Sequence, residues 1–164
     1  RKNLSREVKN RLKSRNKNAV MDALIKIAEL DLPKVTVEAE IQSMMDNARA
    51  DMQRRGVKDV NNVQLPADMF RNLAERRVRL ALIVSSLVQQ NKLHATPEQV
   101  KAHIEDLAAS YEKPEEVIRW YQADARRMSE VEAIVTEDNV TNFVLEKAKV
   151  TEKKVGFDEL MARA

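Results

Sequence analysis

The fold is decided by residues 66–92, which read PADMFRNLAERRVRLALIVSSLVQQNK. Pro66 suits the first position of a helix, because its φ is already helical and it has no N–H group to leave unpaired. Apolar side chains then recur at helical spacing, and over residues 80–84 they cover almost the whole circumference. We therefore expect one long helix here, with residues 80–84 enclosed by other helices at the structural centre.

The sequence on both sides of this helix is also typical of helices. The chain has only two glycines and four prolines, and no stretch alternates in the manner of a strand. Apolar periodicity predicts helices over residues 3–30, from Thr36 to Gly56, from Thr96 to about Tyr111, from Pro114 to Tyr121, and from a break near residues 123–126 to about Lys149, with a last helical turn around Phe157, Leu160 and Met161. The predicted fold class is all-α.

Short signals mark where these helices start and stop. Thr36 is the predicted N-cap of the second helix. Residues 56–65 predict a loop or hairpin tip between antiparallel helices. Thr96, Pro97 and Gln99 predict a capping box with proline at the first helical position.

Length and composition limit the class of protein. The 164 residues are the size of a single domain, 1–164, and the absence of cysteine excludes disulfides and thiol chemistry. The longest apolar run is far shorter than the roughly 20 residues that cross a bilayer, which predicts a soluble chain without a membrane partner. The first residue is Arg1 rather than Met, so we expect a fragment excised from a longer protein, without a signal peptide.

A basic segment, residues 1–17, opens the chain. It contains eight Lys or Arg residues and one acid, Glu7, so its net charge is +7. The whole chain has a net charge of +3, so the remaining residues carry −4. Such a segment is able to contact ribosomal RNA or another acidic partner by neutralising phosphates. A solvated helix end is the favoured interpretation, because no base-reading motif or interleaved aromatic residue accompanies the charges.

Reactive groups do not converge in the sequence. There is no glycine-rich phosphate loop, no pair of histidines at metal spacing and no nucleophile elbow. His94 is predicted in a loop, and His103 is interpreted as a half-buried packing residue. Acidic pairs at 115–116 and 137–138 suit helix starts and solvated faces better than a metal or acid–base site. We predict no catalytic residue, no metal site and no cofactor.

Two sets of apolar side chains are candidate binding surfaces. Methionine repacks around varied partners, so three methionines on one helix face, Met44, Met45 and Met52, are a candidate peptide-binding stripe, with core packing as the equal alternative. The second set flanks the turn at Pro114 and consists of Leu107, Tyr111, Val117, Trp120 and Tyr121. Leu107 and Tyr111 are expected to stack at i, i+4, and the whole set predicts a shallow aromatic groove. A hinge packed for stability is the alternative.

Four stretches carry a resemblance to a known family: ELDLPKVTVEAEI from Glu29, LPADMFRNLAERRVRLAL from Leu65, AASYEKPEEVIRWY from Ala108, and VLEKAKVTEKKVGFDELM from Val144. In this order they resemble the C-terminal chaperone domain of the bacterial trigger factor family, over essentially the whole chain. The resemblance implies an elongated multi-helix domain with two protruding helical arms, similar to the trigger factor/SurA peptide-binding domain. It places peptide contacts at Leu107, Tyr111, Val117 and Trp120, where Leu107 and Trp120 stand at positions that often hold Met and Phe.

The resemblance also implies a function. Family members are ATP-independent cytoplasmic chaperones that bind nascent or unfolded polypeptides beside the ribosome and assist folding, transport and cell division. Their ribosome-docking and prolyl isomerase (rotamase) activities belong to domains that are expected to be absent from this chain, and members are able to form homodimers. The expected mechanism is weak capture of a client by several apolar patches at once. The alternatives are an RNA-contacting module at residues 1–17 and a helical scaffold without an exposed groove.

Overall fold

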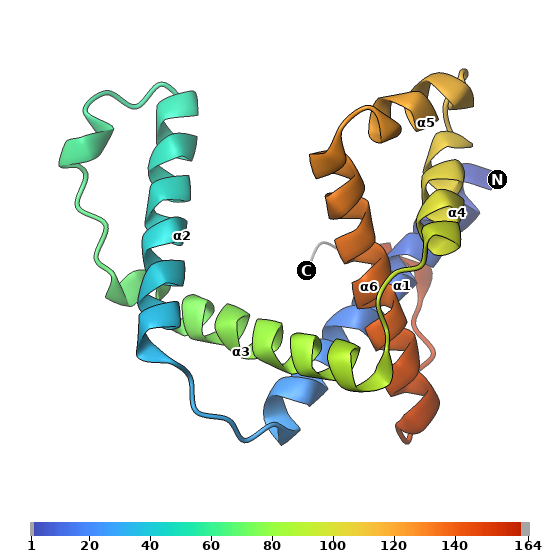
Figure 1. The fold of residues 1–164 in the computed structure, drawn as a ribbon, viewed down its shortest axis with the longest axis horizontal. Coiled ribbons are helices and arrows are strands. Elements are labelled where there is room, and N and C mark those ends of the chain that lie inside the picture. Colours follow the sequence, from blue (N-terminus) through green and yellow to red (C-terminus); the bar gives the residue numbers. More distant parts are fainter. Residues whose placement is uncertain (1, 162–164) are drawn as a thin grey trace. The chain divides into compact units, whose positions relative to one another are not determined.

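A computed structural model describes residues 2–161 of the chain. Its regular elements are α1 (Lys2–Ile27), α2 (Lys34–Arg54), the 3-10 helix η1 (Val60–Asn62), α3 (Asp68–Asn91), α4 (Pro97–Ala108), α5 (Pro114–Gln122), α6 (Ala125–Lys147) and α7 (Phe157–Met161) (Figure 1). No strand occurs among the described residues, which confirms the all-α prediction. The long helix predicted from residues 66–92 is α3.

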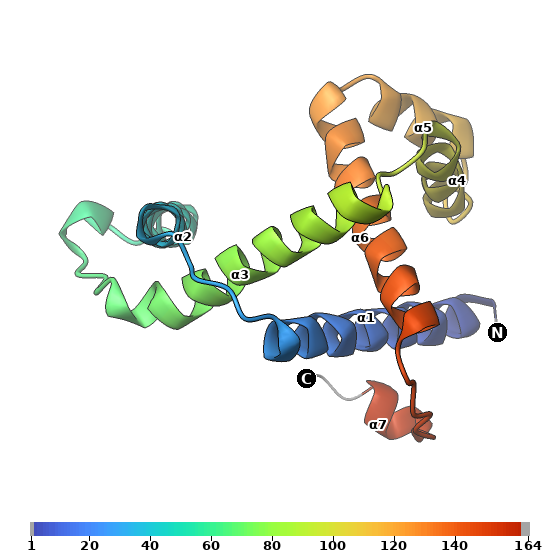
Figure 2. The same ribbon diagram turned by 60° about the horizontal axis from the view of Figure 1, so that its bottom comes forward.

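The chain divides into two compact units. Unit 1 comprises Arg1–Ala23 and Val84–Ala164, and unit 2 comprises Leu24–Ile83. In unit 1 the helices α4, α5 and α6 pack together, α1 lies against α6, and α7 lies beside α1 (Figures 1 and 2). The single domain predicted for residues 1–164, and the two protruding arms implied by the resemblance, stay predictions.

The core of unit 2 is formed where α2 crosses α3. Val37, Ile41 and Met44 of α2 are buried against Ala74 and Val78 of α3. The two helices cross instead of running antiparallel, so that prediction is wrong (Figure 1). Its physical reason is the connection: the backbone leaves α2 at a positive φ of 81° at Gly56, and residues 57–67 return along α2 without becoming an α-helix.

The start of α2 also differs from the prediction. The helix begins at Lys34, two residues before the predicted N-cap Thr36. Pro33 occupies the cap position, and its carbonyl accepts the N–H groups of Thr36 and Val37 at 3.0 and 3.1 Å. Thr36 is therefore already inside the first turn, because a proline with an extended ψ of 119° supplies the cap carbonyl without a side-chain cap.

The most apolar stretch of α3 is less enclosed than predicted. Within residues 80–84 only Ile83 is buried, whereas Ala81 is exposed and Leu82 is 38% exposed. The division between the two units falls directly after Ile83. Ala74 and Val78 belong to the core of unit 2, and Val88 is buried in unit 1, so the stretch between them is covered along one stripe only.

The core shared by α4, α5 and α6 is a cluster of valine and isoleucine side chains. Val100 and Ile104 of α4 are buried against Val131 and Val135 of α6. Ile118 and Tyr121 of α5 and Met128 of α6 are partly buried against them. Three consecutive helices thus share one core, and α5 reaches it only along the side that carries Ile118 and Tyr121.

The predicted capping box at the start of α4 is confirmed. The Thr96 hydroxyl accepts the Gln99 N–H at 3.3 Å, and the Gln99 side chain accepts the Thr96 N–H at 3.0 Å, with Pro97 at the first helical position. The Glu98 backbone N–H and the Thr96 hydroxyl bond the Glu98 carboxylate and hold its pKa below the ordinary value. The capping box and the ionised Glu98 in the first turn both favour the start of a helix at this position.

Replacing Thr96 by alanine is expected to lower the free energy of unfolding by about 1 kcal/mol, because one helix-end N–H loses its acceptor. The pKa of Glu98 should rise toward its ordinary value in the same variant, since the Thr96 hydroxyl bond is one cause of the depression. In the unaltered chain, Glu98 stabilises the fold at pH values above its pKa in the unfolded state. This stabilisation is lost as the pH falls through the lower pKa that Glu98 has in the folded state. Urea unfolding and a carboxyl NMR titration measure both changes. Thr96→Ser is the matched control and should retain both properties.

Candidate functional site: an aromatic hollow at the turn before α5

The turn between α4 and α5, together with α5 itself, carries the two most exposed aromatic residues of the described chain, Tyr111 and Trp120. Helix α4 ends at Ala108, whose carbonyl accepts the Tyr111 N–H at 2.9 Å in the turn that follows. Pro114 then starts α5, because a proline at this position leaves no N–H unpaired. Glu115 and Glu116 in the first turn favour the helix further, since carboxylates are stabilised at a helix N-terminus.

An apolar hollow opens beside this turn. Its volume is ≈ 340 Å³, and it is lined by Tyr111, Glu116, Val117, Trp120 and Tyr121, which we call the aromatic hollow. Trp120 is 53% exposed and Tyr111 is 61% exposed. Helix α5 has no fully buried residue, so much of its apolar side is left at the surface.

Two rings of the aromatic hollow, those of Trp120 and Tyr121, contact each other. The centroids of Trp120 and Tyr121 lie 5.0 Å apart at an interplanar angle of 85°, an edge-to-face pair. Tyr121 also packs on the core cluster of unit 1, so it anchors the pair to the folded body. The Lys113 ammonium lies 2.8 Å from the Glu116 carboxylate and neutralises the one acid in the lining.

The structure brings together four of the five residues that the sequence predicts at this turn: Tyr111, Val117, Trp120 and Tyr121. The fifth, Leu107, is half-buried in α4 and does not line the hollow. Helix α4 ends at Ala108, and Tyr111 lies in the turn beyond it, so the two residues do not share one helix as predicted. The stacking of Leu107 on Tyr111 stays a prediction.

Two residues of the site were missed in the sequence. Glu116 lines the hollow, and Arg127 of α6 lies over the Trp120 ring with its guanidinium carbon 3.8 Å from the ring centroid. No sequence signal identifies Arg127, since it is seven residues from Trp120 and a helix break lies between them. Glu116 stands one residue before Val117, and its place in the first turn was explained by the helix dipole alone.

The methionine stripe of α2 is largely part of the core. Met44 is 9% exposed and belongs to the core of unit 2, Met45 packs against that core, and Met52 is half-buried. These positions agree with the packing alternative, and a role of the three residues in peptide binding stays a prediction. Because buried side chains offer little surface to a client, the stripe is a weaker candidate than the aromatic hollow.

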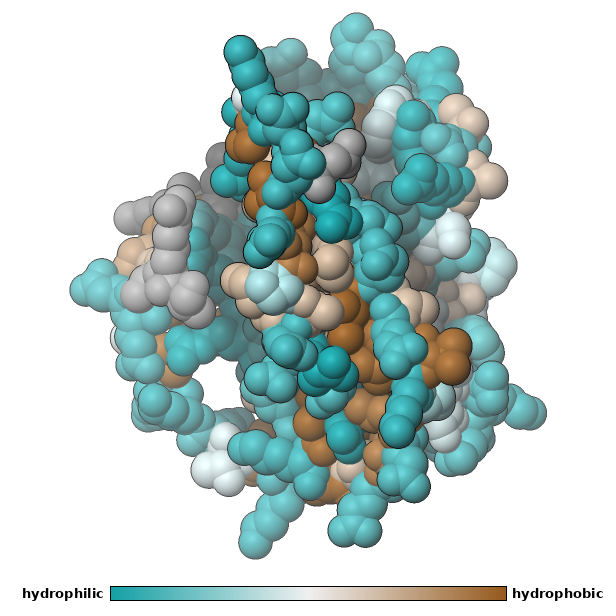
Figure 3. Space-filling model, turned by 90° about the vertical axis from the view of Figure 1, so that its left-hand side faces the viewer, coloured by the Kyte–Doolittle hydropathy of each residue, from teal (hydrophilic) through white to brown (hydrophobic). Residues whose placement is uncertain are grey.

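Unit 2 carries apolar surface elsewhere. A hollow of ≈ 410 Å³ is lined by Thr36, Ala39, Glu40, Arg77, Val78, Ala81 and Leu82, and the Arg77 guanidinium bonds the Glu40 carboxylate at 2.9 Å. Met69 and Leu73 of α3 are 73% and 47% exposed. Figure 3 looks at the side on which α2 lies and shows a band of hydrophobic residues bordered by hydrophilic ones.

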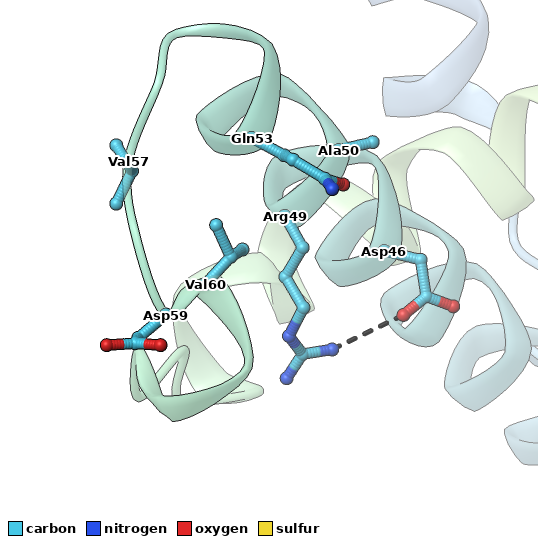
Figure 4. A pocket seen from close by; sticks show the side chains of 7 residues that line it. All are labelled: Asp46, Arg49, Ala50, Gln53, Val57, Asp59 and Val60. Atoms are coloured by element: carbon cyan, nitrogen blue, oxygen red, sulfur yellow. Dashed lines mark hydrogen bonds and ion pairs between the residues drawn. The ribbon is translucent and has the colours of Figure 1, made fainter.

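A more polar hollow lies between α2 and the segment that returns along it. Its volume is ≈ 450 Å³, and its lining residues are Asp46, Arg49, Ala50, Gln53, Val57, Asp59 and Val60 (Figure 4). Within it, the Arg49 guanidinium bonds the Asp46 carboxylate at 3.3 Å. Its one strong cation is thereby paired with an acid of the same helix, so the hollow has no set of converging charges typical of an anion site.

The basic helix α1 is paired with acids of unit 1. Lys13 and Lys17 bond the carboxylates of Asp138 and Glu137 on α6, and Arg6 lies 3.7 Å from the Asp106 carboxylate of α4. Arg15 pairs with α7 through Glu159 at 3.8 Å, and Arg11 donates to the Met161 carbonyl at 3.2 Å. Arg1 lies outside the described residues. The RNA-contacting alternative for residues 1–17 stays a prediction, but much of its charge is already paired within the protein.

Within residues 2–161, no group of three or more potential metal ligands comes together. His103 is half-buried in α4, as expected, and His94 lies in the loop before α4. The described helices include none with the length and apolar character needed to span a bilayer.

Comparison with known proteins gives one consistent result. Residues 1–146 match the family described as the C-terminus of the bacterial trigger factor protein. Relatives named trigger factor include those of Paracidovorax citrulli and Albidiferax ferrireducens, with 62% and 63% identity over 162 residues and 99% of this chain. The relative from Polaromonas naphthalenivorans is 61% identical over the same length. The chain spans 37% of the length of each of these relatives.

Proposed function

The chain belongs to the trigger factor family through its C-terminal domain, and on this premise we propose that it is an ATP-independent chaperone domain that binds exposed apolar segments of nascent or unfolded polypeptides. Binding of this kind aids folding and export of the client in the cytoplasm. The proposal assigns ribosome docking and prolyl isomerisation to parts of the relatives that these residues do not cover. It expects no cofactor.

The observation that carries the proposal is the aromatic hollow. A short helix with no fully buried residue presents Trp120 and, with the turn before it, Tyr111 to solvent beside a hollow of ≈ 340 Å³. Large aromatic side chains bury much apolar area on contact with a partner and are common binding anchors. Exposed apolar surface of this kind is a liability in an ordinary monomer, and in a chaperone it is the working surface.

The hollow is suited to weak and general binding. It is open and small, so it accommodates one or two client side chains rather than a folded partner. A client that also contacts the exposed Met69 and Leu73 of unit 2 would be held by several weak sites, whose combined effect exceeds that of each alone. This mechanism predicts that no single anchor is indispensable.

Trp120→Ala is therefore expected to weaken the binding of a short apolar peptide by less than about tenfold, since one anchor of several is removed. The affinity is measured by peptide titration, and holding is measured as suppressed aggregation of an unfolded client. Phe157→Ala is the matched control, because Phe157 is an aromatic residue 50% exposed outside the hollow. Complete loss of holding in Trp120→Ala, with the fold intact, would contradict the mechanism of several weak sites.

Chemical-shift changes on adding the same peptide test the location. Perturbations clustered at Tyr111, Val117 and Trp120 are expected, because these residues line the aromatic hollow. A response confined to residues 4–17 on addition of RNA, with none to peptide, would favour the RNA-contacting module instead. A dye that reports apolar surface should bind the chain, and its failure to bind would favour the helical scaffold without a groove.

A further inference from the structure

One side chain from α6 holds the exposed tryptophan of α5. The Arg127 guanidinium covers the Trp120 ring at 3.8 Å from its centroid, and its Nη1 donates to the Trp120 carbonyl at 2.6 Å. The same guanidinium lies 3.5 Å from the carboxylate of Asp124, which caps α6 by accepting the Arg126 N–H at 2.8 Å. Arg127 thus joins the indole, the last turn of α5 and the first turn of α6.

We propose that Arg127 is a positioning and specificity residue of the aromatic hollow, which fixes the indole of Trp120 and disfavours client segments that place a cationic side chain there. The inference rests on the proposed function, since it names the class of client side chain that the same site accepts.

The positioning role follows from the exposure of Trp120. A tryptophan that is 53% exposed on a surface helix has few neighbours to select one rotamer. Arg127 covers one face of its ring, and Tyr121 meets the ring edge-to-face at 85°. The anchor is therefore ordered before a client arrives, which reduces the conformational entropy lost on binding.

The specificity role follows from charge. An exposed aromatic ring ordinarily attracts the ammonium or guanidinium of a client, because its face carries negative potential. Here the Arg127 guanidinium already lies over one face of the ring and interacts with that negative potential. A client cation stacked on the other face would be repelled by Arg127 across the ring. Glu116 offers little compensation, since Lys113 pairs with it at 2.8 Å. An uncharged apolar side chain meets no such repulsion.

Three variants separate these roles from general stability. Arg127→Met removes the charge and keeps an unbranched side chain, whereas Arg127→Lys keeps the charge and loses the planar group that covers the ring. Arg126→Met is the matched control, because Arg126 is the neighbouring arginine, 89% exposed and paired with Glu130 at 3.8 Å. Far-UV circular dichroism checks the fold, and if Arg127→Met is not helical, Arg127→Lys decides the positioning role.

Trp120 is the only tryptophan of the chain, so its fluorescence reports on this site alone. The emission anisotropy of the free protein should fall in Arg127→Met and, less strongly, in Arg127→Lys, and should not change in Arg126→Met. Unchanged anisotropy in Arg127→Met would overturn the positioning role without any reference to clients.

Two capped peptides test specificity: one with a central run of leucines, and one with the middle leucine replaced by lysine. The preference for the leucine peptide should fall about two- to fivefold in Arg127→Met and should persist in Arg127→Lys and Arg126→Met. An unchanged preference in Arg127→Met overturns the specificity role. If the unaltered chain binds neither peptide, the proposed function itself is contradicted, and this outcome is distinct from a loss of preference.

Discussion

Val131→Ala is expected to lower the free energy of unfolding of unit 1 by about 2 kcal/mol. Val131 is 2% exposed and lies at the centre of the cluster that joins α4 to α6. Alanine would leave a cavity that neighbouring side chains fill only in part, and Tyr121 of the aromatic hollow packs on this cluster. Urea unfolding followed by Trp120 fluorescence measures the change.

Val78→Ala is the matched control for this substitution. Val78 is 5% exposed in the core of unit 2, so the same two carbon atoms are removed from the other unit. If residues 1–164 unfold as one domain, both substitutions shift the Trp120 transition. If the two units unfold separately, only Val131→Ala shifts it. A Trp120 transition that moves less than about 0.5 kcal/mol in Val131→Ala would contradict the assignment of this cluster as the core of unit 1.

The double substitution Lys13→Glu with Lys17→Glu is expected to destabilise the attachment of α1 to α6 by about 2 kcal/mol. Exposed ion pairs are each worth up to about 1 kcal/mol, and reversal adds repulsion of similar size. Lys13 and Lys17 face Asp138 and Glu137, and the Asp138 side chain is only 17% exposed. Leu4 and Leu12 are half-exposed, so apolar burial compensates poorly for the loss in this part of the helix.

Amide hydrogen exchange in residues 4–17 measures this effect, and it should rise selectively in the double variant. Lys9→Glu with Lys26→Glu changes the net charge equally at two exposed positions of the same helix and should leave exchange nearly unchanged. Adding Glu137→Lys and Asp138→Lys to the first pair restores opposite charges and should restore protection. Equal exchange in both double variants would show that net charge, and not the pairing with α6, is responsible.

The same row of ion pairs explains why the basic segment was ambiguous in the sequence. Eight cations in residues 1–17 are compatible with a solvated helix end, which was the favoured interpretation, and with contact to RNA or another acidic partner. The structure shows that acids on α4, α6 and α7 accept several of these cations, although they lie more than 90 residues along the chain. Local spacing carries no information about such distant pairs.

The helices themselves were predictable, because periodicity and caps are local properties. Residues 66–92 predicted α3 within two residues at each end, and Thr96 with Gln99 predicted a capping box that is present. Two of the errors concern helix ends. Pro33 rather than Thr36 caps α2, and α4 ends before Tyr111.

The sequence by itself determined that the chain is all-α, where its helices lie, and that aromatic residues flank the turn at Pro114. Tertiary structure decided which of those residues meet: Leu107 does not line the hollow, Glu116 does, and Arg127 covers Trp120. It also decided that Met44 lies in the core and that several charges of α1 are paired with acids elsewhere in unit 1. The reason is physical: helix formation depends on neighbours within one or two turns, whereas burial and charge pairing depend on how separate helices pack.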